Sequence, residues 1–244
     1  MNTVKILDTD ISETSVDEVS EILNNKKSVK VAICNTNTVV RSQRDEGLNK
    51  VINSFDIKAP DGFPIAKSSS LLYKNNQERV DGYKVFLSTI RKGLTKNTSH
   101  YFYGSDEHVL NKLINNLQED FPEINIVGSF SPPIGNYEEL TDSKYINDMQ
   151  ETKPDIVWVS LGFPKQELFI EHLSTKYPTQ SNLVGVGAVF EWVAGTKIKA
   201  PELIANLGLE WVLRLIQEPK RLFKRYFIDN LLFLYLIVKQ FISK

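Results

Sequence analysis

The stretch DIVWVSLGFPKQE, residues 155–167, contains the local transition that decides the fold. Residues 155–162 are almost continuously apolar, a pattern typical of a strand that is covered on both faces of a sheet. Gly162 then ends the run, and Pro164 favours a helix start, because proline is tolerated at the first helical position. The stretch therefore predicts a buried strand that passes directly into a helix.

The rest of the chain repeats this alternation of apolar runs and helical segments. The expected strands are 29–34, 57–60, 100–104, 124–130, 155–162 and 182–190, and the expected helices include 16–23, 39–52, 65–73, 83–92 and 107–117. Continuous apolar strands separated by helices indicate a parallel sheet with crossover helices. We therefore expect an α/β fold, a Rossmann-like parallel-sheet sandwich with helices on both faces of the sheet.

Length and composition narrow the class of protein. The 244 residues suit one large domain with an appendage, and the 41% hydrophobic content is sufficient for a core. Cys34 is the only cysteine, which excludes an internal disulfide and a cysteine-based zinc site. The chain does not begin with a basic segment followed by an apolar one, so we expect no signal peptide and a cytoplasmic protein.

Residues 197–244 form a basic segment with nine Lys/Arg and four Asp/Glu, although the whole chain carries a net charge of −1. The apolar run at 231–238 is too short to cross a bilayer, which takes roughly 20 residues. A basic stretch that leads into leucine and aromatic residues suits a helix lying on an anionic membrane surface. A helix docked on the body, or on another subunit of a homo-oligomer, is the alternative, and the sequence does not separate the two.

Glycine and polar residues follow the expected strands at their carboxyl ends, where ligands bind in open parallel sheets. They are Asn35 and Asn37, Asp61 and Gly62, Gly104 and Ser105, and Gly162, Lys165 and Gln166. Asp61 is the most unusual, because a carboxylate among the apolar residues of IKAPDGFPIAK (57–67) costs free energy unless it is paired or has a function. Gln166 falls in the first turn of its helix, beside free backbone N–H groups that can hold a phosphate or a sugar hydroxyl. An ordinary β-to-α turn explains that motif equally well when it is taken singly.

Several other kinds of site lack support. Gly185-Val186-Gly187 begins a dinucleotide fingerprint, but Phe190 stands at its third glycine position. Asp8-Thr9-Asp10 precedes the first expected helix, where capping or a surface turn explains it better than metal binding. The three histidines have no ligand spacing, and no Ser/His/Asp arrangement is apparent. We therefore expect no metal, no cofactor and no nucleic-acid partner.

Taken together, the motifs resemble the WecG/TagA/CpsF glycosyltransferase family of bacterial cell-surface polysaccharide synthesis. The resemblance covers about residues 30–226. It rests on the ordered set APDG (59–62), RVDG (79–82), LGFPKQE (161–167), GVGAVFEWVAG (185–195), KAP (199–201) and GLEWVLRLIQEPKRLFKRY (208–226). Each motif alone is weak evidence, but the set in this order and spacing is specific.

The resemblance implies an inverting transferase that moves a sugar from UDP onto a polyprenyl-diphosphate-linked acceptor. In the best-known members the sugar is N-acetylmannosamine and the acceptor is N-acetylglucosamine-diphospho-undecaprenol. The product would enter teichoic acid, capsule or exopolysaccharide, and the reaction would need no metal. With the basic segment, we expect a catalytic α/β domain at 1–200 and a helical membrane-associating appendage at 201–244, on the inner face of the plasma membrane. Another UDP-hexose or uronic acid donor, and a non-catalytic UDP-binding assembly module, are the alternatives.

Carried over residue by residue, the resemblance implies that Asp61 is the catalytic base and that Arg79 and Gln166 share in catalysis. With the strand-end positions, it gives substrate contacts from Asn35, Asn37, Gly62, Gly104, Ser105, Gly162, Lys165, Gly187, Glu191, Arg214, Arg221 and Arg225. The three arginines are expected to meet the diphosphates. Tyr83, Glu191 and Lys199 depart from the family pattern, which leaves the exact donor sugar and acceptor open.

Overall fold

The computed structural model describes residues 1–206 and 208–243, and all of their side chains except those of Asn206, Arg221, Lys224, Arg225 and Tyr226. Within these residues, the centre is a six-stranded sheet in the order β4-β3-β8-β7-β5-β6, and every neighbouring pair of strands is parallel. The strands are β3 (Lys30–Cys34), β4 (Ile57–Pro60), β5 (Ser99–Gly104), β6 (Asn125–Phe130), β7 (Ile156–Ser160) and β8 (Asn182–Gly185). This confirms the predicted α/β fold with a parallel sheet.

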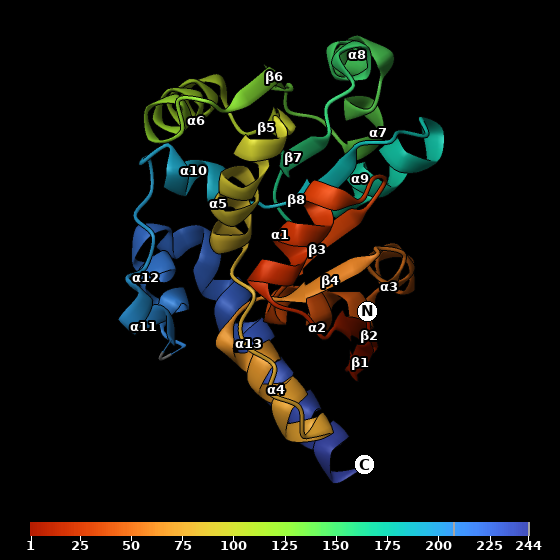
Figure 1. Ribbon diagram of the computed structural model, residues 1–244. Helices are drawn as coiled ribbons and strands as arrows, with labels where there is room; N and C mark the ends of the chain where they lie inside the picture. The colour runs from red at the N-terminus through yellow and green to blue at the C-terminus, as the bar shows by residue number, and fades with distance from the viewer. Residues whose placement is uncertain (207, 244) are drawn as a thin grey trace.

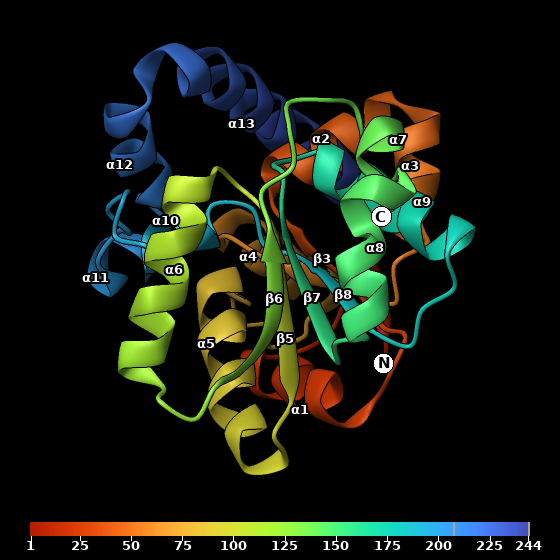
Figure 2. The same ribbon diagram turned by 90° about the horizontal axis from the view of Figure 1, so that it is seen from above.

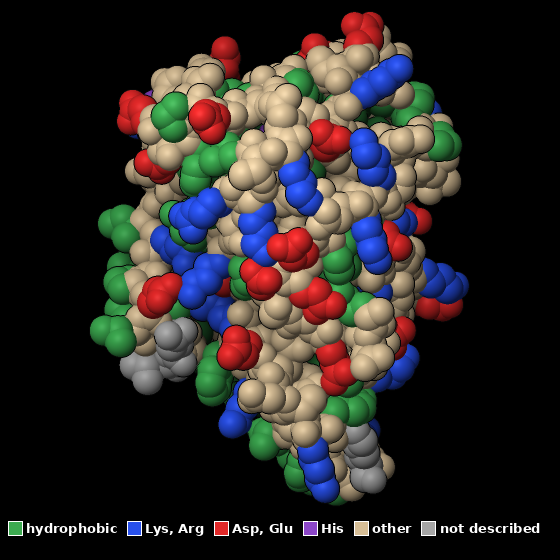
Figure 3. Space-filling model, in the orientation of Figure 1, with side chains coloured by type: hydrophobic (Ala, Val, Ile, Leu, Met, Phe, Trp, Pro, Cys, Tyr) green, Lys and Arg blue, Asp and Glu red, His purple; other side chains and the backbone are tan. Residues whose placement is uncertain are grey.

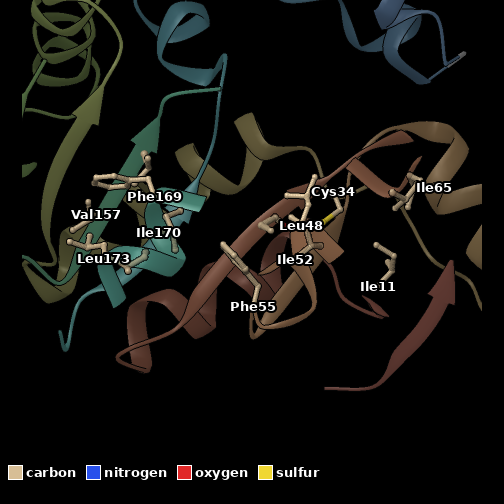
Figure 4. Close-up of a cluster of buried hydrophobic side chains, with 14 of the residues drawn as sticks. Ile11, Cys34, Leu48, Ile52, Phe55, Ile65, Val157, Phe169, Ile170 and Leu173 are labelled. Atoms are coloured by element: carbon tan, nitrogen blue, oxygen red, sulfur yellow. Dashed lines mark hydrogen bonds between the residues drawn. The ribbon is translucent and has the colours of Figure 1, made fainter. Parts of the chain in front are cut away.

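Helices cover both faces of the sheet (Figure 1, Figure 2). One face carries α1 (Val16–Asn25), α5 (Gly82–Gly93), α6 (Glu107–Asp120) and α10 (Val189–Val193), and the other carries α2 (Thr36–Arg44), α3 (Glu46–Asn53), α7 (Tyr137–Leu140), α8 (Ser143–Thr152) and α9 (Lys165–Lys176). Neighbouring residues of β7 enter opposite cores: Val157 faces the α9 side, whereas Ile156 and Trp158 face the α5 side. Figure 4 shows part of the core on the α9 side, with Val157 on β7 and Phe169 on α9. The continuous apolar run therefore reflects burial on both faces, as predicted.

The strand expected at 182–190 is shorter than predicted. β8 ends at Gly185, and Gly187 has a positive φ of 56° that turns the chain out of the sheet. The apolar residues that follow belong to helix α10, which buries Val189 and Phe190 in the core with α5 and α6. A short apolar run does not distinguish a buried strand from a buried helical turn, which explains the error.

Two further features differ from the expected elements. The stretch 39–52 forms two helices, because Asp45 ends α2 and caps α3 by accepting a hydrogen bond from the Leu48 N–H at 3.0 Å. Strands β1 (Thr3–Ile6) and β2 (Thr9–Ser12) form an antiparallel hairpin that packs beside β4. This hairpin had no counterpart among the predicted strands, because Asp8-Thr9-Asp10 was interpreted as a helix cap or a surface turn, whereas Thr9 and Asp10 begin β2.

The C-terminal region consists of α11 (Glu202–Asn206), α12 (Glu210–Gln217) and α13 (Pro219–Ile242). Helix α13 docks along α2, and its Phe233 is buried in the same core as α2 and the hairpin. Two polar contacts join the helices at the start of α2. Thr36 Oγ1 donates to Asn230 Oδ1 at 2.8 Å, and Asn37 Nδ2 donates to the buried Asp229. One side of α13 is therefore fixed on the body of the protein.

The far ends of α13 and α4 (Phe63–Tyr73) meet at the hairpin (Figure 1). Gln240 Nε2 donates to the Lys5 carbonyl at 2.9 Å, and Gln240 Oε1 accepts from the Leu7 N–H at 2.9 Å. Tyr73 Oη, at the end of α4, donates to the same Lys5 carbonyl at 2.8 Å. Among the described residues, none of the helices combines the length and the apolar composition that crossing a bilayer requires.

Candidate active site

Two cavities meet beyond the carboxyl ends of the strands, and both are lined by Asn35, Asp61 and Arg214. One has a volume of about 250 Å³ and lies beside the ends of β3, β7 and β8. The other, of about 460 Å³, lies between the start of α4 and the C-terminal region. Asp61 is therefore at the junction of two binding spaces, at the strand end where the sequence analysis expected it.

The smaller cavity is largely polar. Its lining includes Ser105, Ser160, Gly162, Gln166, Glu167, Gly187, Glu191 and Trp192. The turns that carry these residues are bonded to one another: Ser160 Oγ donates to the Gly187 carbonyl at 2.7 Å, and the Ser105 N–H donates to the Ser160 carbonyl at 2.8 Å. The ends of β5, β7 and β8 thus form one continuous surface for a polar ligand.

Gln166 is buried in the wall of this cavity, in the first turn of α9. Its side chain packs on Gly185, where an added Cβ would lie 3.0 Å from Nε2, so the glycine leaves the space that the amide occupies. Gln166 Nε2 donates to Glu167 Oε1 at 2.9 Å. Among the described residues nothing donates a hydrogen bond to Gln166 Oε1. A buried acceptor without a hydrogen bond costs free energy, so this oxygen favours a ligand that donates a hydrogen bond to it.

The larger cavity is mostly apolar. Its lining includes Phe63, Trp211, Leu215, Phe223, Phe227, Leu231, Phe233 and Leu234. Aromatic and leucine side chains of α12 and α13 thus face the start of α4 across the cavity. A concave apolar surface with a few polar groups at one end favours a ligand that has both a hydrocarbon part and a polar part.

The backbone around Asp61 fixes this carboxylate at the edge of the sheet. Its N–H donates to the Cys34 carbonyl at 2.8 Å, which extends the pairing of β3 and β4 by one residue. Gly62 has a φ of 84° and turns the chain directly into α4. A residue with a Cβ is strained at this φ, so the glycine sets the position of the carboxylate that precedes it.

Arg79 brings three carboxylates together beside the cavities. Its Nε donates to Asp61 Oδ1 at 3.2 Å, and its Nη2 lies 3.2 Å from Asp81 Oδ2 and 2.6 Å from Glu210 Oε2. Lys199 Nζ lies 2.8 Å from Asp81 Oδ2 and adds a second positive charge. Although burial opposes the charge of Arg79, the carboxylates raise its pKa, so it stays a cation.

The same surroundings change the protonation of Asp61. Burial raises the pKa of Asp61 to about 6; Arg79 opposes this rise, and Asp81 and Glu210 add to it. At neutral pH the carboxylate is ionised and can accept a proton, whereas below about pH 6 it is increasingly protonated. This is the range in which a general base is most effective.

Arg214 reaches the junction from α12. Its guanidinium lies over the Trp192 ring, 5.3 Å from the ring centre. Glu191, on α10, pairs with Lys197 at 2.6 Å, and Lys197 also pairs with Glu218 just before α13. These contacts join α10 to the C-terminal region around the polar cavity.

Some predicted contact residues lie outside these two cavities. Asn37 is buried and donates to α13 instead. Gly104 brings β5 close to β7, since a Cβ there would lie 2.4 Å from the Ser160 carbonyl oxygen, and its contact with substrate stays a prediction. Lys165 begins α9 and lines neither cavity.

The C-terminal region contains two predicted contact residues whose side chains are not described and two cavity residues that the sequence analysis did not predict. Arg221 and Arg225 lie in α13, but their side chains are outside the described part of the structure, so these two contacts stay predictions. Glu210 and Trp211 were missed as site residues. Both belong to the quoted C-terminal motif, but a glutamate in the first turn of a helix is ordinary and carries no signal of its own.

The junction can support transfer of a group between a polar ligand and an amphiphilic one. Asp61 can take a proton, and Arg214 offers positive charge to an anionic ligand in either cavity. Carboxylate bases and fixed guanidinium groups are what a reaction with a weak nucleophile and an anionic leaving group requires.

The sequence matches a known family over nearly its whole length. The description Glycosyl transferase WecG/TagA/CpsF family fits residues 4–244. An N-acetylglucosaminyldiphosphoundecaprenol N-acetyl-beta-D-mannosaminyltransferase of Bacillus spizizenii is 28% identical over 221 residues, which cover 91% of this chain and 84% of that protein. Proteins of the same name from Bacillus subtilis and Staphylococcus aureus are each 27% identical, over 82% and 78% of this chain and 75% and 72% of their own lengths. The chain belongs to the WecG/TagA/CpsF family of glycosyltransferases, as its motifs predicted.

Proposed function

We propose that the protein is an inverting glycosyltransferase that moves N-acetylmannosamine from a UDP-sugar to a GlcNAc-diphospho-undecaprenol type of acceptor. The observation that carries this proposal is the junction of a polar and an apolar cavity at Asp61. A sugar nucleotide suits the polar cavity, and a polyprenyl chain suits the apolar one. The relatives' names, which state this transfer, support the choice of sugar and acceptor. The product would enter a cell-surface polysaccharide such as teichoic acid, capsule or exopolysaccharide.

In the proposed reaction, an acceptor hydroxyl oxygen attacks the anomeric carbon of the donor sugar while Asp61 takes the hydroxyl proton. The bond from that carbon to the β-phosphate oxygen breaks, and UDP leaves with the electron pair. Attack from the side opposite the phosphate inverts the anomeric centre. Gln166 Oε1, buried in the polar cavity, accepts a hydrogen bond from the UDP-sugar and orients it.

The leaving diphosphate needs positive charge as its bond to the sugar breaks. Arg214 lines both cavities and supplies a planar guanidinium, which binds two phosphate oxygens at once. Backbone N–H groups at the start of α9, after Gly162, can donate further hydrogen bonds to the phosphates or the sugar of the UDP-sugar. Arg221 and Arg225 are proposed as further partners of the diphosphates. These groups stabilise the charge that develops in the transition state.

A membrane-contacting face is proposed on the outer sides of α4 and α13. Three residues at helical spacing along α4 are exposed, Phe63, Lys67 and Leu71, and the exposed Lys74 directly follows the helix. Exposed apolar residues of α13 include Val238, and also Phe223, Phe227, Leu231 and Leu234 where the apolar cavity that they line opens to the surface. Figure 3 shows hydrophobic side chains and a Lys or Arg side chain on the lower projection, where Figure 1 places α4 and α13. Apolar side chains flanked by lysines suit an anionic lipid surface.

This face defines the proposed placement of the protein in the cell. Residues 201–244 act as a membrane-associating appendage of a catalytic domain at 1–200, on the cytoplasmic side of the plasma membrane. The apolar cavity begins beside this face, because Phe63 is exposed on α4 and also lines the cavity. A lipid-linked acceptor would then reach Asp61 without leaving the bilayer surface.

The function is tested by UDP release from a panel of UDP-sugars, with and without a detergent-solubilised GlcNAc-diphosphate lipid. We expect release to depend on the acceptor and to be fastest with UDP-N-acetylmannosamine. Faster release with another UDP-hexose or a UDP-uronic acid would overturn the choice of sugar. UDP binding without sugar transfer from any donor would overturn the enzymatic function in favour of a non-catalytic assembly module.

The membrane face is tested by Leu71→Asp, which places a charge in the middle of the outer side of α4. Leu71 is 57% exposed, so the fold should be unaffected, whereas sedimentation with vesicles of phosphatidylglycerol and phosphatidylethanolamine should fall several-fold. Ile134→Asp is the matched control, because Ile134 is fully exposed in the loop after β6, at the opposite edge of the sheet from β4. Equal vesicle binding by the two variants would contradict a role for α4.

A further inference from the structure

Glu210 links the C-terminal region to the carboxylate at the junction of the cavities. Its Oε2 lies 2.6 Å from Arg79 Nη2, and Arg79 Nε donates to Asp61 Oδ1 at 3.2 Å. The side chains of Asp61, Arg79 and Glu210 are 22%, 15% and 16% exposed, so solvent screens their interactions weakly. Arg79 therefore bridges one carboxylate at the edge of the sheet and another on α12.

We propose that Glu210 is a positioning residue for the transfer reaction: by holding Arg79, it fixes the orientation of the guanidinium against Asp61. The proposal rests on the proposed function, in which Asp61 is the base. Glu210 does not act on the substrates in this role. It acts through Arg79, and only while α12 is docked on the body of the protein.

The charges around Asp61 give the direction of the effect. Arg79, Asp81 and Glu210 face it, and Lys199 contacts Asp81 from the loop before α11. A guanidinium shared among three carboxylates neutralises each of them less than a guanidinium paired with one. Glu210 also repels the Asp61 charge directly, which adds to the rise in the Asp61 pKa.

Docking of α12 therefore adjusts the base as well as closing the cavities. With Glu210 in place, Asp61 holds a proton more strongly and is a better base for a hydroxyl group. Without Glu210, Arg79 turns fully to Asp61 and Asp81, and the proton affinity of Asp61 falls. The carboxylate then becomes a weaker base, even though the polar cavity keeps its lining and the apolar cavity loses only the Glu210 carboxylate.

The experiment compares Glu210→Gln with Glu202→Gln. Glu202 is a carboxylate of α11 that pairs with the exposed Lys84 at 2.7 Å, so it is a control from the same region. Two quantities are measured: the pH titration of the Asp61 carboxyl by carbon-13 NMR, assigned with Asp61→Asn, and the pH profile of kcat. In Glu210→Gln, both the titration and the acid limb of kcat should move to lower pH, and the kcat plateau should fall about tenfold. Glu202→Gln should match the wild type, and Glu210→Asp, which keeps the charge, should lie between the wild type and Glu210→Gln.

An Asp61 titration that is unchanged in Glu210→Gln, with only a lower melting temperature, would overturn the proposal and leave Glu210 as a structural anchor. The proposed function can fail separately. If the titration moves as expected but Asp61→Asn keeps its turnover, the coupling between Glu210 and Asp61 stands and the base assignment falls. The NMR readout makes the two failures distinguishable.

Discussion

Replacing Asp61 with asparagine should lower kcat by about 10²- to 10⁴-fold while the protein folds normally. The amide has nearly the shape of the carboxylate but cannot accept the proton of the acceptor hydroxyl. Arg79 keeps Asp81 at 3.2 Å and Glu210 at 2.6 Å as partners, so no buried charge is left unpaired. UDP release at saturating donor and acceptor measures the loss, and calorimetry should show that UDP still binds.

Asp56 provides a control for this substitution. It lies just before β4, at the opposite end of the strand from Asp61, and accepts a hydrogen bond from the Lys30 N–H at 2.8 Å. Asp56→Asn removes one carboxylate beside the same strand without touching either cavity, and its turnover should be that of the wild type. Near-normal turnover in Asp61→Asn would remove Asp61 from the role of base.

Deleting residues 222–244 should abolish transfer to a lipid-linked acceptor but retain UDP binding, weakened only by the loss of the contact proposed for Arg225. The two cavities respond differently because the described side chains of α13 contribute Phe223, Phe227, Asn230, Leu231, Phe233 and Leu234 to the apolar cavity and none to the polar one. The deletion also removes Phe233 from the core, so a lower melting temperature is expected. Transfer is measured with detergent-solubilised acceptor, and UDP affinity is measured by calorimetry on the same preparation.

Two point variants make this prediction independent of any loss of stability. Leu231 and Val238 are both 54% exposed on α13, but Leu231 lines the apolar cavity and Val238 does not. In detergent, Leu231→Asp should reduce transfer at least tenfold by placing a charge on the apolar wall, whereas Val238→Asp should retain it. Full transfer by the truncated protein, or equal transfer by the two point variants, would contradict a role for α13 in the acceptor site.

Local patterns were sufficient to predict the sheet and the strand-end residues. The run at 155–162 is apolar at every position that enters either core, so the buried strand β7 follows from composition alone. Asp61 and Gly62 follow β4 directly, and their location at the edge of the sheet depends only on where that strand ends. Gln166 lies in the first turn of α9 for the same reason.

The remaining features depend on contacts between distant parts of the chain. Arg79 and Glu210 are 131 residues apart, and neither has a local pattern that indicates the other. Asn37 also follows β3, and the sequence has no signal that the docking of α13 supplies Asp229 as its hydrogen-bond partner. Helix periodicity predicts an apolar side for α13 but not which element that side packs on.

The contact between Gln240 and the Lys5 carbonyl has a consequence for the biogenesis of the protein. The ribosome makes the hairpin before α13, and contacts of such large sequence separation form slowly. Until α13 emerges, the core on the α2 side lacks Phe233 and the apolar cavity lacks one wall. The nascent chain can therefore fold its sheet early, but its apolar cavity is complete only once α13 has been made and docked. A chain that stops before α13 would keep its sheet and most of both cores, yet it would lack one wall of the apolar cavity.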